Sequence, residues 1–222
     1  MSGQFDAFHA LESGKKERII NAALDEITQK GFKKASTNTI IKQAGISKGM
    51  LFYYFGSKEE LFDFLCEYTI EFAKGEYIEK FAKQIKTRDF IERCKALSEI
   101  KKYAMTHYPK ITKFYESSFL PSNGPYFSKY SASIQEIYHA VRDGLYENID
   151  YSLFRDGIEP EKTLIYIRWL TERYEKELTD KLIDEGGILR GDVEAAFGDY
   201  YGFLADLKKA FYKNEGEMSC EV

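Results

Sequence analysis

Apolar residues near the start of this chain recur at the spacing of an α-helix. One helical turn takes 3.6 residues, so apolar positions three and four apart lie on one face. The residues that follow this rule are Ile19, Ile20, Ala23, Leu24 and Ile27. Gly31 comes next, and glycine commonly ends a helix in the left-handed conformation. The pattern predicts a helix over residues 15–30 with one buried face.

Two short helices are predicted next, each bounded by residues that start and stop helices. Thr37 can cap the first of them, and Gly45 ends it. Ser47 can cap the second, which runs to about Phe55 before Gly56 breaks it. We therefore expect three helices within the first quarter of the chain.

The remainder of the chain also has helical patterns. Ser57 and Glu60 form a predicted capping box, each side chain bonding the amide of the other, at the start of a long helix. Further helices are predicted over residues 89–107, 110–119, 126–147, 161–185 and 192–213, with loops at 121–125 and at Gly186-Gly187. The predicted fold class is all-α.

Charge is distributed unevenly along the chain. The net charge is -4, yet residues 15–60 hold nine Lys or Arg against five acids, a balance of +4. Residues 61–222 carry -6. A basic N-terminal segment on an acidic body suggests one surface made for a polyanion.

The two short helices are joined by Ala44-Gly45-Ile46-Ser47, which is typical of a helix-turn-helix. In this unit the second helix enters the DNA major groove. Ser47 and the free amides at the helix start can bond a phosphate, and Lys48 can reach a phosphate or a guanine edge. Gly49 has no side chain to hold the DNA backbone away. These residues predict the DNA-reading end of the helix.

Aromatic residues follow on the same helix. Phe52, Tyr53 and Tyr54 can face thymine methyls and phosphates, while Leu51 and Phe55 point into the domain. The alternative is an aromatic cluster buried on a short core helix. Adjacent residues lie about 100° apart on a helix, so burying both tyrosines is difficult.

A longer run of residues carries a family resemblance. It comprises Arg18-Ile19-Ile20-Asn21-Ala22-Ala23-Leu24, Gly31-Phe32, Thr37, Ile40, Ala44-Gly45-Ile46-Ser47-Lys48-Gly49, Phe52-Tyr53-Tyr54-Phe55 and Lys58-Glu59-Glu60-Leu61. This stretch resembles the DNA-binding domain of the tetracycline-repressor (TetR) family. The resemblance implies an N-terminal three-helix domain with a helix-turn-helix, a larger helical body that binds a small-molecule effector and dimerises, and effector-controlled repression.

The resemblance also implies which residues contact DNA. The matched positions are Thr37, Ser47, Lys48, Gly49, Phe52, Tyr53, Tyr54 and Lys58. Phe52 stands where the family often has Tyr, so a hydroxyl contact is lost there, and Tyr54 stands where many members have His. Lys58 lies at a helix start, which the helix dipole mildly disfavours for a cation. A solvated lysine is the alternative at that position.

Four segments follow from these patterns. We expect an N-terminal arm over residues 1–14, a DNA-binding domain over 15–60, a ligand-binding and dimerisation domain over 61–213, and a flexible tail over 214–222. The arm carries Phe5, Phe8 and Leu11, which we expect to pack against the first helix.

The sequence of residues 61–213 indicates less about function than that of residues 15–60. Apolar residues of the last two long helices predict, with the resemblance, a four-helix homodimer interface, and burial in the core is the alternative. They are Ile165, Ile167, Leu170, Tyr174, Leu178, Phe197, Tyr201, Leu204, Leu207 and Phe211. Candidates for an effector cavity are Tyr103, Tyr115, Tyr138, Arg168, Trp169 and Glu172. Aromatic residues at helical spacing are also typical of a core.

Several functional classes are disfavoured. The three histidines are scattered without metal-ligand spacing, and no P-loop, GxGxxG or GxSxG pattern occurs, so we expect neither an enzyme nor a cofactor. The start lacks a signal peptide, and no stretch approaches the ~20 apolar residues of a membrane span, so the protein is expected in the cytoplasm. Cys66 and Cys94 are expected as buried, reduced thiols. An activator, or a ligand-binding protein whose N-terminal domain no longer binds DNA, remains an alternative to a repressor.

Overall fold

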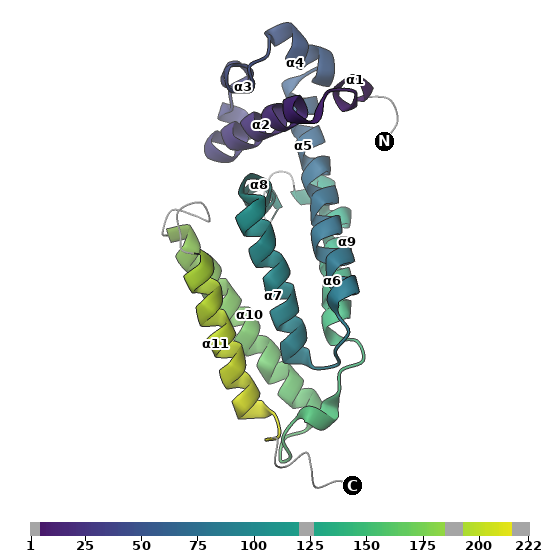
Figure 1. Cartoon of the computed structure of the whole chain (residues 1–222), viewed down its shortest axis with the longest axis vertical. Coiled ribbons are helices and arrows are strands. Elements are labelled where there is room, and N and C mark those ends of the chain that lie inside the picture. The colour runs from purple at the N-terminus through teal and green to yellow at the C-terminus, as the bar shows by residue number, and fades with distance from the viewer. Residues whose placement is uncertain (1–4, 120–126, 185–192, 215–222) are drawn as a thin grey trace. The chain divides into compact units, whose positions relative to one another are not determined.

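The computed structural model describes residues 5–119, 127–184 and 193–214, and these residues fold into helices without a β-strand (Figure 1). The elements are α1 (Asp6–His9), α2 (Ser13–Lys34), α3 (Thr37–Ala44), α4 (Lys48–Phe55), α5 (Lys58–Ala73), the π-helix η1 (Lys74–Glu79), α6 (Lys80–Gln84), α7 (Phe90–His107), α8 (Pro109–Phe119), α9 (Phe127–Tyr146), the 3₁₀ turn η2 (Tyr151–Leu153), α10 (Pro160–Asp184) and α11 (Val193–Phe211). The all-α prediction is confirmed. The loops predicted at 121–125 and at Gly186-Gly187 lie outside the described residues.

The chain divides into two compact units. The head unit contains the residues up to Lys74 together with Tyr108–Gln135, and the body unit contains Gly75–His107 together with the residues from Glu136 onward. The expected DNA-binding segment 15–60 lies inside the head unit. Its boundary, and those of the other predicted segments, stay predictions. No helix in the described part of the chain is long and apolar enough to cross a membrane.

The glycines of the head unit interrupt the helices where the sequence predicted. Gly45 closes α3 with φ 66° and Gly56 closes α4 with φ 69°. Gly31 has φ 70° and non-helical backbone, so the long first segment of α2 ends where predicted, and a short second segment continues α2 after this kink to Lys34. Left-handed backbone costs an L-residue roughly 1–2 kcal/mol, which is why glycine occupies these positions.

The helix starts agree less closely with prediction. Ser47 caps α4 and Ser57 caps α5, each accepting an amide proton with its hydroxyl oxygen. The prediction for α3 was wrong by one residue, because Ser36 caps it by accepting the amide of Thr39 at 3.4 Å. Thr37 is therefore the first helical residue. The amide of Ser57 donates to Phe55 O at 2.7 Å, which replaces the second half of the predicted capping box.

Aromatic rings form the core of the head unit. Phe8, on the short helix α1, has its ring centroid 4.9 Å from Phe55 of α4 and 5.0 Å from Phe64 of α5. Phe5 lies 5.1 Å from the same Phe64 ring. The N-terminal arm thus packs against α4 and α5, whereas we expected the first helix, because these two helices supply the aromatic surface.

The body unit has its own core between α7, α10 and α11. Its buried side chains include Phe90, Ile91, Cys94, Leu164, Ile167, Tyr200, Leu204 and Leu207. A polar contact joins the same helices, since Tyr200 donates to the Glu175 carboxylate at 2.9 Å and Lys101 approaches it at 2.8 Å. Lys101 and the Tyr200 hydroxyl outweigh the effect of burial and lower the pKa of Glu175, which stays ionised.

Candidate nucleic-acid interface

The turn between α3 and α4 has the geometry of a helix-turn-helix. The amide of Ile46 donates to Ile41 O at 3.2 Å, which closes the end of α3. Ser47 then turns the chain in an extended conformation, and its hydroxyl oxygen accepts the Met50 amide at 3.2 Å. The remaining free amides at the start of α4 point along the helix axis and can bond a phosphate.

Most of the predicted DNA contacts lie on the surface of the head unit. Ser47, Lys48 and Gly49 are exposed, and Tyr53 has 74% of its surface exposed. Phe52 is half-buried, with the Lys48 ammonium 6.0 Å from its ring centroid. The start and middle of α4 therefore present one cation, one hydroxyl-bearing ring and free backbone amides together. Thr37 is half-buried at the start of α3.

Tyr54 is the exception among the aromatic residues. Only 7% of its surface is exposed, and its ring lies near Phe8 and Phe55. The helical rotation of about 100° between neighbours turns Tyr54 inward when Tyr53 faces outward. The expectation that both tyrosines would not be buried together holds, but the structure does not bring Tyr54 to the surface with the other predicted contacts.

Lys58 has a local structural role. Its ammonium donates to Lys33 O at 3.3 Å, in the last turn of α2, and lies 4.8 Å from the Phe32 ring centroid. A cation near the C-terminal end of a helix is favourable. This contact explains a lysine at the start of α5 without DNA, and a phosphate contact from Lys58 stays a prediction.

Sequence reasoning missed one residue that positions α3. Glu26 of α2 is buried, and its carboxylate accepts the Ser36 amide at 2.9 Å. This bond fixes the residue that caps α3, and therefore the start of the helix-turn-helix. A glutamate on a helix is ordinarily solvated, so nothing in the sequence distinguished this one.

Replacing Glu26 with alanine should lower the free energy of unfolding by about 1–3 kcal/mol, because the Ser36 amide loses a charged acceptor inside the protein. Glu26→Gln keeps a carbonyl acceptor and should cost less. Urea unfolding followed by circular dichroism measures both. Equal stability of Glu26→Ala and the original chain would show that this bond does not position α3.

The structure does not bring the predicted cavity residues together around one cavity. Tyr138 and Trp169 are 63% and 57% exposed, and Tyr103 is exposed and stacked on His107 with ring centroids 4.0 Å apart. Arg168 and Glu172 form a surface pair at 3.9 Å. Tyr115 lies in the head unit, where burial raises its pKa to about 12. Helical spacing alone did not separate surface, core and cavity positions.

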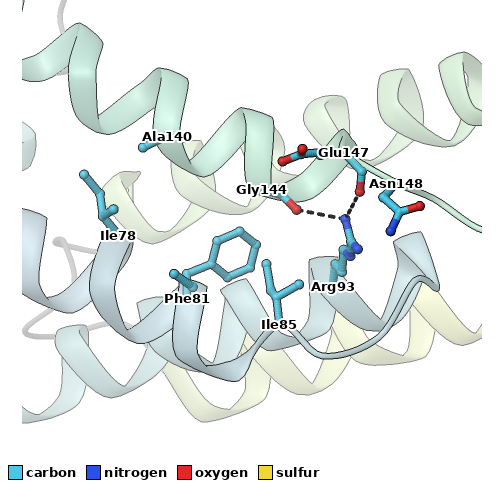
Figure 2. Close-up of a pocket in the computed structure, with 9 residues that line it drawn as sticks. Ile78, Phe81, Ile85, Arg93, Ala140, Gly144, Glu147 and Asn148 are labelled. Carbon is cyan, nitrogen blue, oxygen red and sulfur yellow. Dashed lines mark hydrogen bonds between the residues drawn. The ribbon is translucent and has the colours of Figure 1, made fainter.

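A cavity of about 310 Å³ lies elsewhere in the body unit (Figure 2). It is lined by Ile78, Phe81, Ala82, Ile85, Arg93, Ala140, Gly144, Glu147 and Asn148. None of the predicted cavity residues is among them. Six of the nine lining residues are apolar, and the charged and amide side chains lie near the end of α9.

The cysteines of the described residues are inert thiols. Cys66 and Cys94 are buried and reduced, and burial raises the pKa of both thiols, so they stay protonated. Cys220 lies outside the described residues. Within the residues that the structure describes, no group of three His, Cys, Asp or Glu side chains is placed to hold a metal ion.

Comparisons with known proteins agree with this geometry. Residues 19–64 match the model of the bacterial regulatory proteins of the tetR family. The uncharacterised HTH-type transcriptional regulator YvdT of Bacillus subtilis is 40% identical over 67 residues, which is 28% of this chain and 34% of the relative. The HTH-type transcriptional regulator RutR of Escherichia coli is 48% identical over 50 residues, 22% of this chain and 24% of the relative. The matches thus span about a third or less of these relatives.

Solved structures extend the likeness to the whole fold. The ketosteroid transcriptional regulator KstR2 of Mycobacterium tuberculosis aligns with a TM-score of 0.60 and 19% identity, covering 92% of this chain and 97% of that one. A TetR-family transcriptional regulator from Chloroflexus aurantiacus gives a TM-score of 0.54 with 18% identity, covering 94% and 98%. At these identities the likeness concerns the fold alone.

The matched family and the named relatives are regulators of transcription, in agreement with the expectation that the chain is not an enzyme. The resemblance seen in the sequence is confirmed by the match at residues 19–64 and by the helical fold around it. Residues 19–64 of the chain therefore match the N-terminal domain of the bacterial regulatory proteins of the tetR family, within a TetR-like all-α fold.

Proposed function

We propose that this protein is a ligand-responsive DNA-binding regulator of transcription, acting as a repressor that a small-molecule effector releases from a near-palindromic operator. The observation that carries the proposal is the surface of α4. Exposed Lys48 lies at the capped start of the helix and exposed Tyr53 farther along it, while Phe55 anchors the same helix in the aromatic core.

The proposed DNA contacts are of two kinds, those to phosphates and those to base edges. The α4 amides and the Ser47 hydroxyl bind phosphate oxygens, which places the helix on the duplex without reading sequence. Lys48 binds a phosphate or the acceptors on a guanine edge, and the Tyr53 ring packs on a thymine methyl or its hydroxyl donates to a phosphate. Thr37, Gly49 and Phe52 border this surface. The half-buried ring of Phe52 offers only apolar contact.

The second part of the proposal is a homodimer that uses α10. The exposed large apolar residues of this helix are Ile165, Tyr166, Trp169 and Leu170, which we call the α10 face. The interface residues predicted from the sequence were partly wrong: Ile167, Phe197, Leu204 and Leu207 are buried in the protomer and are not available to a partner. A two-fold dimer that binds two half-sites one DNA turn apart needs its two DNA-reading helices about 34–36 Å from each other.

The proposed effector binds in the body unit. Two relatives carry names that concern lipids: the fatty acid metabolism regulator protein of Bacillus subtilis, 31% identical over 74 residues, and the ketosteroid regulator KstR2. We propose that this chain also responds to a small, largely apolar molecule. Effector binding shifts the population between dimer conformations with different operator affinity.

Fluorescence anisotropy on the DNA upstream of the protein's own gene, at two salt concentrations, tests the proposal with Lys48→Ala. We expect weaker binding and a salt slope flatter by about one unit, because one phosphate contact is lost. Lys176→Ala, an exposed lysine of the body unit, is the control and should bind as the original chain does.

The outcome separates the remaining alternatives. The DNA-binding proposal fails if the original chain and both variants bind weakly and equally and selection from random DNA enriches no palindrome. The alternative is then a ligand-binding protein whose N-terminal unit does not bind DNA. If the operator overlaps the promoter, repression is supported, whereas an operator upstream of the promoter indicates an activator.

A further inference from the structure

Arg93 stands at the polar end of the body-unit cavity. It projects from α7 and has only 6% of its surface exposed. Its Nη1 donates to Glu147 O at 2.6 Å and Gly144 O at 2.9 Å (Figure 2). Its Nε donates to Thr87 O at 2.7 Å. The guanidinium therefore holds the last carbonyls of α9 and is fixed in place by backbone atoms alone.

Arg93 forms no direct ion pair with a carboxylate of the described residues. Its Nη2 also donates no hydrogen bond to any of these residues. Burial lowers the pKa of Arg93 and the Glu147 carboxylate opposes this shift, yet an arginine stays protonated in either case. A buried cation that forms no direct ion pair is costly, and an anion that reaches it regains part of that cost.

The free nitrogen has space beside it. Arg93 Nη2 is not fully enclosed by protein atoms, and the Arg93 side chain lines the cavity. Away from Arg93, Glu147 and Asn148 the wall is apolar: Ile78 comes from η1, Phe81 from α6 and Ile85 directly after α6. Ala140 and Gly144 come from α9. A Cβ on Gly144 would lie 3.2 Å from the Phe81 ring, so this glycine lets Phe81 pack closely against α9 beside the cavity.

We propose that the cavity binds a small monocarboxylate with a compact apolar body, whose carboxylate receives hydrogen bonds from Arg93 Nη2. Charge-assisted bonds from a guanidinium to a carboxylate are stronger than neutral ones and fix its orientation. A volume of 310 Å³ is near the lower end for ligand pockets and accommodates on the order of ten non-hydrogen atoms. This inference deepens the effector part of the proposed function.

Glu147 provides a second residue at which the carboxylate site can be tested. Its side chain is exposed and lines the cavity, while its backbone carbonyl accepts from Arg93. Its carboxylate repels an incoming anion, so Glu147→Gln should strengthen carboxylate binding while preserving the backbone contact of Arg93. Unchanged binding of the acid in Glu147→Gln would place the bound carboxylate away from this end of the cavity and overturn its contact with Arg93.

The test uses isothermal titration calorimetry of the full chain, without DNA, with 3-phenylpropionate and its neutral amide as probes. We expect the acid to bind at least about tenfold more tightly than the amide. Glu147→Gln should improve the affinity for the acid by about threefold and leave the amide unchanged. Ala140→Phe, which fills the cavity without touching the bonds of Arg93, should abolish binding of both.

Each result decides the inference. Absence of binding, equal affinity for acid and amide, or unchanged binding in a folded Ala140→Phe variant overturns the carboxylate site. Because no DNA is present, such a failure leaves the proposed DNA-binding function intact. Loss of operator binding in Lys48→Ala is measured separately and does not depend on this cavity.

Discussion

Replacing Phe55 with alanine is expected to lower the free energy of unfolding by about 3–5 kcal/mol. Phe55 is 1% exposed, and its ring lies 4.9 Å from Phe8 and 5.2 Å from Phe64 by centroid distance. Removing it leaves a cavity where α1, α4 and α5 meet, and rigid aromatic neighbours refill such a space poorly. Urea unfolding followed by circular dichroism measures the loss.

Tyr53→Ala is the matched control for this substitution. It removes an aromatic ring from the same helix, but Tyr53 is exposed, so stability should change by less than about 0.5 kcal/mol. Operator binding should weaken in both variants: in Tyr53→Ala through a lost contact, and in Phe55→Ala through a displaced helix. Equal loss of stability in the two variants would contradict the arrangement of α4 described above.

Replacing Trp169 with glutamate is expected to weaken the proposed homodimer by about 100-fold in its dissociation constant. Trp169 lies at the centre of the α10 face, between Ile165 and Leu170, and more than half of its surface is exposed in the protomer. In a two-fold interface the substitution acts twice and places like charges close together in an apolar contact. Analytical ultracentrifugation over a range of protein concentrations measures the shift.

Another helix of the body unit provides the control for this experiment. Lys83 of α6 pairs with Glu79 at 3.6 Å, and both side chains are exposed. Lys83→Ala removes one surface ion pair and should leave self-association unchanged. A chain that is monomeric at all concentrations without any substitution, or a Trp169→Glu variant that remains dimeric, would reject the α10 face as the interface.

The sequence by itself determined the helix-turn-helix because the signals there are local. Gly45 and Gly56 take left-handed conformations that other residues adopt only at a cost, and Ser47 supplies the acceptor that a helix start needs. Such effects act within a few residues, so they can be read without knowledge of the fold. Where two neighbouring residues offered the same chemistry, as Ser36 and Thr37 did at the start of α3, the choice was wrong by one position.

Only the tertiary structure decided which side of each helix meets another element. It buried Tyr54 and exposed Tyr53, engaged Glu26 with the start of α3, and placed Arg93 at the end of a cavity that no sequence pattern indicated. Helical periodicity reports that a residue lies on an apolar stripe, but not whether that stripe faces a core, a cavity or a partner chain. The contacts of these residues join segments up to tens of positions apart, and the packing that selects them exists only once the chain has folded.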